Sequence, residues 1–113
     1  MALPTPMPAD LAELIAARLR AIGDANRIRI LDLLRDGELS VAQITEQLGT
    51  SQQNASKHLG VLLQSGIVTR RKAGTSALYR VSDPGVYELC EQVCGGLRDQ
   101  LAELDTILTG GVA

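Results

Sequence analysis

The apolar residues of the chain recur every three or four positions as far as residue 65, change to a two-residue period near residue 67, and return to the first spacing after residue 83. Because an α-helix turns every 3.6 residues, the first pattern predicts helices and the second predicts strands. The helical stretch falls into four segments, which are Leu11 to Ile22, Asp24 to Leu34, Ser40 to Leu48 and Ser51 to Ser65.

Polar residues and a glycine mark the ends of these helices. Asp24 and Ser51 stand where N-caps are expected, and Ser40 with Gln43 three residues later matches a capping box. Gly49 is a natural stop for the third helix. The residues expected to face inward from the second helix are Ile28, Leu31 and Leu34.

Residues 67–82 have the alternation of a β-hairpin, with a turn at Ala73-Gly74-Thr75 and three consecutive basic residues at 70–72. Upstream, Glu38-Leu39 leaves room for one very short additional strand.

A long helix is predicted at the end of the chain. Asp83 as the cap and Pro84 at the first helical position form a start signal, and Gly110-Gly111 supply the stop. A domain of this size cannot cover so long an apolar stripe by itself, so we expect this helix to contact a helix of a second subunit. The stripe comprises Val86, Leu89, Val93, Leu97, Leu101, Leu104 and Leu108.

Length and composition limit the class of protein. The 113 residues are enough for one domain, expected over residues 9–110 after a flexible tail over residues 1–8. The hydrophobic residues make up 45% of the chain, and they include no Phe or Trp, which favours helices over an all-β fold. No apolar run approaches the roughly 18 residues of a membrane span, and the start lacks a secretory signal. The sequence therefore predicts a cytoplasmic protein with no membrane partner.

The charge of the chain is unevenly distributed. Residues 1–50 carry five basic and seven acidic side chains, residues 51–80 carry five basic and none acidic, and residues 81–113 carry one basic and six acidic. These segments sum to −2, +5 and −5. The acid-free segment is either a surface that faces a polyanion or a solvated face with accidental charge sorting.

The predicted order is helix, helix, short strand, helix, helix, two strands and helix, a mainly α fold with a small β-hairpin. Two short helices joined by Gly49-Thr50-Ser51 have the sequence shape of a helix-turn-helix, and the hairpin after them completes a winged helix-turn-helix order. One face of the fourth helix gathers amide and hydroxyl groups without a carboxylate, which favours contact with a nucleic acid groove. This face comprises Gln53, Asn54, Ser56, Lys57 and Gln64.

Three segments resemble the ArsR/SmtB family of small dimeric bacterial repressors. They are residues 21–35 (AIGDANRIRILDLLR), 48–66 (LGTSQQNASKHLGVLLQSG) and 67–81 (IVTRRKAGTSALYRV), and the resemblance extends over residues 10–109. It implies a homodimer, formed by the first and last helices, that binds a palindromic double-stranded DNA operator and releases it when an inducer arrives.

Carried over to this chain, the resemblance places the fourth helix in the major groove and the hairpin beside it as the wing. The backbone N–H of Ser51 would meet a phosphate, and His58, at the edge of the apolar face, is more suited to packing or a phosphate contact than to reading bases. The candidate DNA-contact residues are Ser51, Gln52, Gln53, Asn54, Ser56, Lys57, His58, Arg70, Arg71, Lys72, Thr75 and Arg80.

Most metal ligands of the family are missing. Members that sense soft metals often carry Cys-Val-Cys where this chain has Ser40-Val41-Ala42, and the chain has a single histidine. A thiol-directed signal must then enter through Cys90 and Cys94, one helical turn apart and expected to be thiols. No cofactor is required, and a soft metal or metalloid ion, or an oxidant, is the candidate inducer.

Two alternatives stay open. The cysteines can be small buried hydrophobic residues, which would leave a constitutive DNA-binding repressor without a switch. A winged helix used only for protein contact is the other, because a fold does not dictate a function. An enzyme is not expected, since the sequence has no catalytic motif, phosphate-binding loop or cofactor fingerprint.

Overall fold

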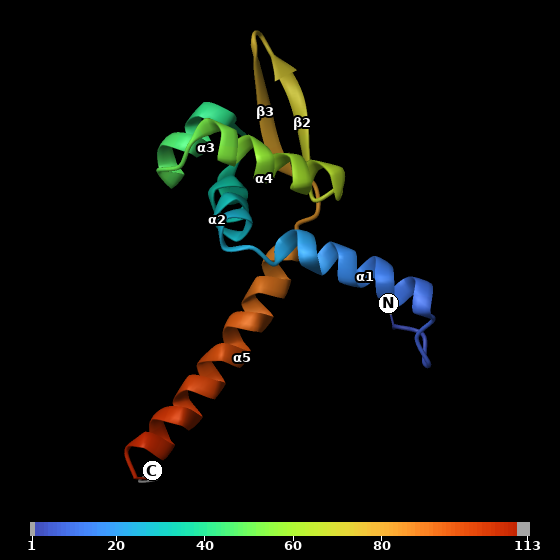
Figure 1. Ribbon diagram of the computed structural model, residues 1–113, viewed down its shortest axis with the longest axis vertical. Helices are drawn as coiled ribbons and strands as arrows, with labels where there is room; N and C mark the ends of the chain where they lie inside the picture. The colour runs from blue at the N-terminus through green and yellow to red at the C-terminus, as the bar shows by residue number, and fades with distance from the viewer. Residues whose placement is uncertain (1, 111–113) are drawn as a thin grey trace. The chain divides into compact units, whose positions relative to one another are not determined.

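The computed structural model describes residues 2–110, and Figure 1 traces their path. The elements are α1 (Ala9–Ile22), α2 (Ala25–Leu33), the 3-10 helix η1 (Leu34–Asp36), β1 (Leu39–Ser40), α3 (Val41–Leu48), α4 (Gln52–Gln64), β2 (Val68–Ala73), β3 (Ser76–Val81) and α5 (Gly85–Leu108). This order confirms the predicted winged helix-turn-helix arrangement.

The structure divides into two compact units at the bond between Asp83 and Pro84. The first unit holds α1 to α4 and the sheet, and with them every candidate DNA-contact residue. The second unit holds α5 and both cysteines. Over residues 2–110, none of the helices combines the length and the apolar character that crossing a bilayer requires.

The predicted caps of the short helices are confirmed. Asp24 accepts hydrogen bonds from two backbone N–H groups at the start of α2, and the hydroxyl of Ser51 accepts one at the start of α4. Ser40 and Gln43 form both bonds of a capping box. Gly49 follows α3 with a φ of 68°, a left-handed conformation that glycine adopts without a steric penalty, so the chain can turn directly into α4.

The predicted inward face of α2 is wrong at one position. Ile28 is 41% exposed, whereas Ile30, which was not expected to face inward, is fully buried with Leu31 and Leu34. Helical residues at i, i+1 and i+4 share a face, and Ile28 lies about 200° around the helix from Ile30. The side chains with almost no exposed surface are Ile30, Leu31, Ile44, Leu59, Leu62, Ile67 and Val68.

The hairpin is confirmed, and it is the larger part of a three-stranded antiparallel sheet of order β1-β3-β2. The added strand was predicted at Glu38-Leu39 but covers Leu39–Ser40, which pairs with Tyr79 and Leu78 of β3. Ala73 pairs with Ser76, so the turn consists of Gly74 and Thr75 alone. The wing is therefore joined to the segment that leads into the helix-turn-helix.

The last helix begins one residue later than predicted, at Gly85, with Pro84 before it in the cap position. The carboxylate of Asp83, expected as the cap, accepts a hydrogen bond of 2.6 Å from Arg18. Helix α5 ends at Leu108, and of the predicted stop signal Gly111 lies outside the described residues.

Candidate nucleic-acid interface

The outer face of α4 is polar and solvent-exposed. The side chains of Gln52, Gln53, Ser56 and Lys57 are exposed, and no carboxylate lies on this helix. An open hollow at the start of the helix is lined by Ser51, Gln53, Asn54 and Lys57. Amides, hydroxyls and an ammonium group can meet base edges and phosphates in a major groove.

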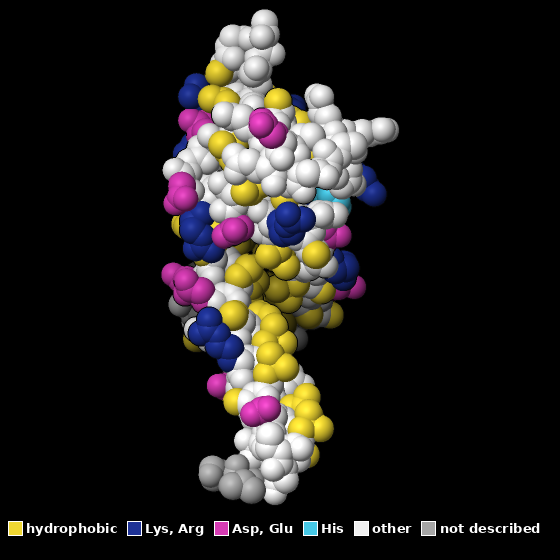
Figure 2. Space-filling model, turned by 90° about the vertical axis from the view of Figure 1, so that its left-hand side faces the viewer, with side chains coloured by type: hydrophobic (Ala, Val, Ile, Leu, Met, Phe, Trp, Pro, Cys, Tyr) yellow, Lys and Arg dark blue, Asp and Glu magenta, His cyan; other side chains and the backbone are white. Residues whose placement is uncertain are grey.

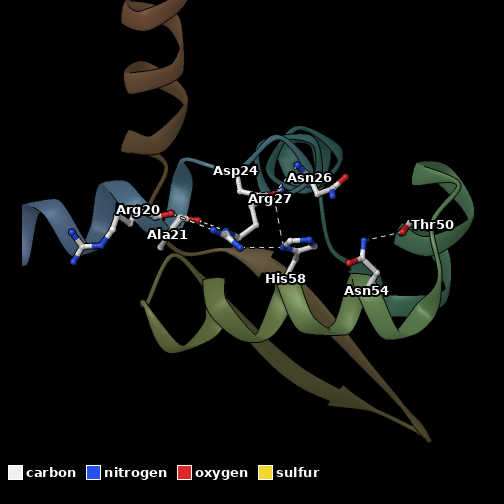
Figure 3. A network of polar contacts seen from close by, with 8 residues as sticks. All are labelled: Arg20, Ala21, Asp24, Asn26, Arg27, Thr50, Asn54 and His58. Atoms are coloured by element: carbon white, nitrogen blue, oxygen red, sulfur yellow. Dashed lines mark hydrogen bonds and ion pairs between the residues drawn. The ribbon is translucent and has the colours of Figure 1, made fainter.

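Two of the predicted contact residues also hold the turn before α4. The hydroxyl of Ser51 accepts a hydrogen bond of 3.1 Å from the backbone N–H of Asn54. The side-chain amide of the half-buried Asn54 donates a bond of 2.9 Å to the hydroxyl of Thr50, as Figure 3 shows. These bonds fix the beginning of α4, where the first N–H groups of a helix are available to an anion.

The basic residues of the wing lie on both faces of the sheet. Arg70 is opposite Tyr79 and shares a face with Lys72, whereas Arg71 and Arg80 lie on the other face. All four basic side chains are exposed, as is Thr75 in the turn. The continuous basic run in the sequence is thus divided between two faces, with Arg70 and Lys72 on one and Arg71, together with Arg80, on the other.

Arg71 differs from the other three in having an acidic partner. Its Nε donates hydrogen bonds of 2.8 and 3.1 Å to the two carboxylate oxygens of Glu38. This contact raises the pKa of the Arg71 guanidinium. Glu38 lies just before β1 in the chain. It therefore places a negative charge beside the wing, although residues 51–80 contain no acidic side chain of their own. Sequence reasoning missed this pair because its members are 33 residues apart.

His58 does not share the exposure of its neighbours on α4. It is 6% exposed, and its Nδ1 lies 3.1 Å from Nη1 of Arg27 and 3.8 Å from Oδ1 of Asp24. Of the roles considered for His58, this burial favours packing over a contact with DNA.

Arg27 is a residue that the sequence analysis did not single out. Its Nε donates a bond of 2.6 Å to the carbonyl of Ala21, and its Nη2 donates one of 3.2 Å to the carbonyl of Arg20. Figure 3 shows the guanidinium between the end of α1 and the ring of His58. In the sequence, Arg27 stands out only as the third residue of a capped helix. Many solvent-exposed arginines occupy such positions, so this does not identify it as a contact residue.

The aspartate of this group caps α2. Oδ1 of Asp24 accepts bonds of 2.9 and 3.1 Å from the backbone N–H groups of Asn26 and Arg27. The bond from the Arg27 N–H is the main reason that the pKa of Asp24 lies below its ordinary value, and the charge of Arg27 acts in the same direction, although burial opposes both.

A second arginine reaches the C-terminal end of α4. Arg18 of α1 donates a bond of 2.7 Å to the carbonyl of Ser65, which follows the last residue of α4, and its Nη2 forms the 2.6 Å ion pair with Asp83. The middle of α4 is thus held by an arginine of α2, and its C-terminal end by an arginine of α1.

In the second unit, neither cysteine is buried in the single chain. Cys90 is half-buried and Cys94 is exposed, and both are free thiols. Over residues 2–110, no group of three or more His, Cys, Asp or Glu side chains could hold a metal ion. Two thiols of one chain would have to be completed by ligands from elsewhere.

The apolar stripe of α5 is exposed for most of its length. Val86 is buried, but Val93, Leu97, Leu101 and Leu104 are each about half exposed, at 48% to 62%. Figure 2 shows hydrophobic side chains, in yellow, following one another along this helix in the lower part of the view. On α1, Leu14 and Leu19 are also exposed. Such surfaces are typical of contacts between subunits.

Comparisons with known proteins agree with this fold. Residues 22–71 match the family model of a helix-turn-helix domain. The chain is 35% identical to the HTH-type transcriptional regulator KmtR of Mycobacterium tuberculosis over 76% of its own length and 66% of that protein. It is 32% identical to the probable mercury resistance operon repressor of Streptomyces lividans, over 88% of this chain and 79% of that one.

A solved structure gives the same relationship in three dimensions. It is the homodimeric winged helix-turn-helix DNA-binding domain Mb0332 from Mycobacterium bovis, described as an ArsR-family candidate. The TM-score is 0.72 at 32% sequence identity, over 84% of this chain and 88% of that one.

Proposed function

This chain belongs to the ArsR/SmtB family of helix-turn-helix transcriptional regulators, and from that premise we propose that it binds a palindromic DNA operator as a homodimer and represses transcription. The proposed activity is binding rather than catalysis, and the proposed location is the cytoplasm. In this proposal α4 is the recognition helix and the β2–β3 hairpin is the wing.

The observation that carries the proposal is the outer face of α4. Its exposed amides, hydroxyl and ammonium stand on a helix without carboxylates, next in sequence to a wing with four exposed basic side chains. A surface that only bound protein would have no need to exclude acidic residues over 51–80. We assign base reading to Gln53 and Ser56 and phosphate contact to Lys57 and the wing.

The exposed apolar residues of α5 and α1 support the homodimer. A helix with half-exposed leucines spaced over several turns is stabilised when a second copy covers them. A twofold dimer presents two recognition helices, so its operator should contain two symmetric half-sites about one helical turn, roughly 34 Å, apart.

The test is a selection from a random pool of duplexes by the purified protein, followed by binding titrations on the selected sequence. We expect a twofold symmetric motif that binds at least ~10³-fold more tightly than unrelated DNA, with affinity that falls steeply as salt rises. Selection of no motif, together with equal affinity for all duplexes, would contradict the proposal.

We propose in addition that a soft metal or metalloid ion, or an oxidant, acts at Cys90 and Cys94. Both are free thiols one helical turn apart on α5, so their sulfurs can act together on one ion or reagent. Thiolates are the ligands that soft ions prefer, and a second copy of the chain would supply two further sulfurs. The constitutive repressor remains the competing candidate.

The signal is tested by titrating the protein–operator complex with arsenite, Cu(I), Cd(II), Zn(II), Hg(II) and a disulfide-forming oxidant. One of these should release wild type from DNA but leave a Cys90→Ala, Cys94→Ala double variant bound, with a typical coupling of about 1 to 3 kcal/mol. If none of them releases the wild type, the constitutive repressor is supported instead.

A further inference from the structure

The buried side of α4 is tied to α1 through one side chain of α2. The guanidinium of Arg27 contacts the last carbonyls of α1 with two of its nitrogens and Nδ1 of His58 with the third. His58 follows Lys57 directly and lies two residues after Ser56, both on the outer face of α4. A rotation of α4 that moved these side chains would also move His58 against Arg27.

The contact fixes which nitrogen of His58 carries a proton. A guanidinium only donates hydrogen bonds, so at 3.1 Å the Nδ1 of His58 must be the acceptor. The ring is then neutral, with its hydrogen on Nε2. A second charged group, the carboxylate of Asp24, lies 3.8 Å from this nitrogen. It can attract Nδ1 only after Nδ1 has taken up a proton.

We propose that Arg27 is a positioning residue for operator recognition, which holds α4 in its DNA-reading orientation through the hydrogen bond to neutral His58. The inference rests on the proposed DNA-binding function. When Nδ1 takes up a proton, a donor faces the guanidinium and two positive charges meet, so the bond to Arg27 is lost and Nδ1 turns to Asp24. The recognition helix then loses one of the contacts that hold its orientation.

The sign of the pH dependence follows from this exchange. Acidification is the change that adds a proton to an imidazole. Operator affinity should therefore fall on acidification, once Nδ1 takes up that proton. A His58 that contacted a phosphate directly would give the opposite result, because its protonation would add a positive charge at the DNA. His58 is the only histidine in the sequence, so its contribution can be isolated by substitution.

The experiment measures operator and random-DNA affinity of the full-length protein from about pH 5.5 to 7.5 at constant salt. The informative variant is His58→Asn, because Oδ1 of Asn occupies nearly the position of Nδ1 and accepts a hydrogen bond at any pH. His58→Leu removes the acceptor but keeps apolar bulk. Arg27→Gln removes the guanidinium, and Arg29→Gln, at an exposed arginine of the same helix, is the matched control for lost charge.

We expect wild type to lose about tenfold in operator affinity at the acid end, a loss of the size of one hydrogen bond to a charged group. His58→Asn should bind as wild type does near pH 7.5 and keep that affinity at pH 5.5. His58→Leu and Arg27→Gln should bind the operator weakly at both, whereas Arg29→Gln should keep the wild-type pH profile. Thermal unfolding of each variant separates lost positioning from lost folding.

Two results would overturn the inference while leaving the proposed function intact: a wild type whose specific binding does not weaken toward acid, or a His58→Asn variant that loses affinity as His58→Leu does. A wild type that selects no operator would overturn the proposed function and this inference with it.

Discussion

Glu38 and Arg71 form a two-bond contact, with Nε of the arginine 2.8 and 3.1 Å from the two carboxylate oxygens, across the narrow sheet that carries the wing. The arginine is 59% exposed at its side chain, so solvent weakens the pair and its contribution to stability is small. The ion pair matters because it lowers the net positive charge of the wing. One of the four basic residues of the wing is neutralised by a residue from another part of the chain.

Glu38→Gln should therefore increase DNA binding. The freed guanidinium can contact a phosphate, which should make the slope of log affinity against log salt steeper by about one unit. Titrations at several salt concentrations measure this slope. Asp36→Asn, an exposed acid two residues earlier, is the matched control, and an equal change in both variants would mean that net charge alone acts.

Gln53→Ala should weaken specific binding by about 1 to 3 kcal/mol, because an amide that pairs with a base edge is lost. Affinity for random DNA should barely change, since the amide carries no charge. Gln92→Ala, at an exposed glutamine of α5 outside the candidate interface, should be neutral on both duplexes. Equal losses on operator and random DNA would show that Gln53 does not read bases.

Asp24→Ala should lower the free energy of unfolding by about 1 kcal/mol through loss of the N-cap of α2. Because the pKa of Asp24 is lowered from 3.8 in the folded protein, the carboxylate stabilises the fold above that unfolded value, and this stability is lost as pH falls through the folded pKa. Urea unfolding at neutral and strongly acidic pH checks both points. Asp32→Ala, with a 72% exposed side chain on the same helix, should cost much less.

The double substitution Leu97→Glu and Leu101→Glu should produce monomers, because four charges would have to be buried in each dimer. Sedimentation equilibrium at micromolar concentration measures the change. Ala102→Glu places a charge on an exposed position about 160° around the helix from Val86, away from the stripe, and should leave the dimer intact. A monomeric wild type would contradict the proposed assembly.

The local parts of this structure could be predicted from the sequence. A cap such as Asp24 or Ser40 acts on N–H groups two or three residues away, so a short window contains both partners. The order of elements and the exposed face of α4 follow from such windows, because a helical period determines which residues share a face.

Contacts between distant segments could not be found in this way. Arg27 and His58 are 31 residues apart, and no spacing rule joins them. The pairing of Leu39 with Tyr79 likewise depends on how the hairpin folds back. The error at Ile28 has another cause, since in a helix of nine residues two overlapping apolar stripes compete and only packing selects between them.

The strand β1 ends at Ser40 and α3 begins at Val41, so no spacer separates them. Ser40 is at once the residue paired with Leu78 and the cap whose hydroxyl meets Gln43. One inserted residue would have to break either the strand register or the capping box. Gly74 and Thr75, in the exposed turn of the hairpin, neither pair with another strand nor cap a helix. Insertions and deletions among related proteins should therefore accumulate at the tip of the β2–β3 hairpin. The junction between β1 and α3 should keep a constant length.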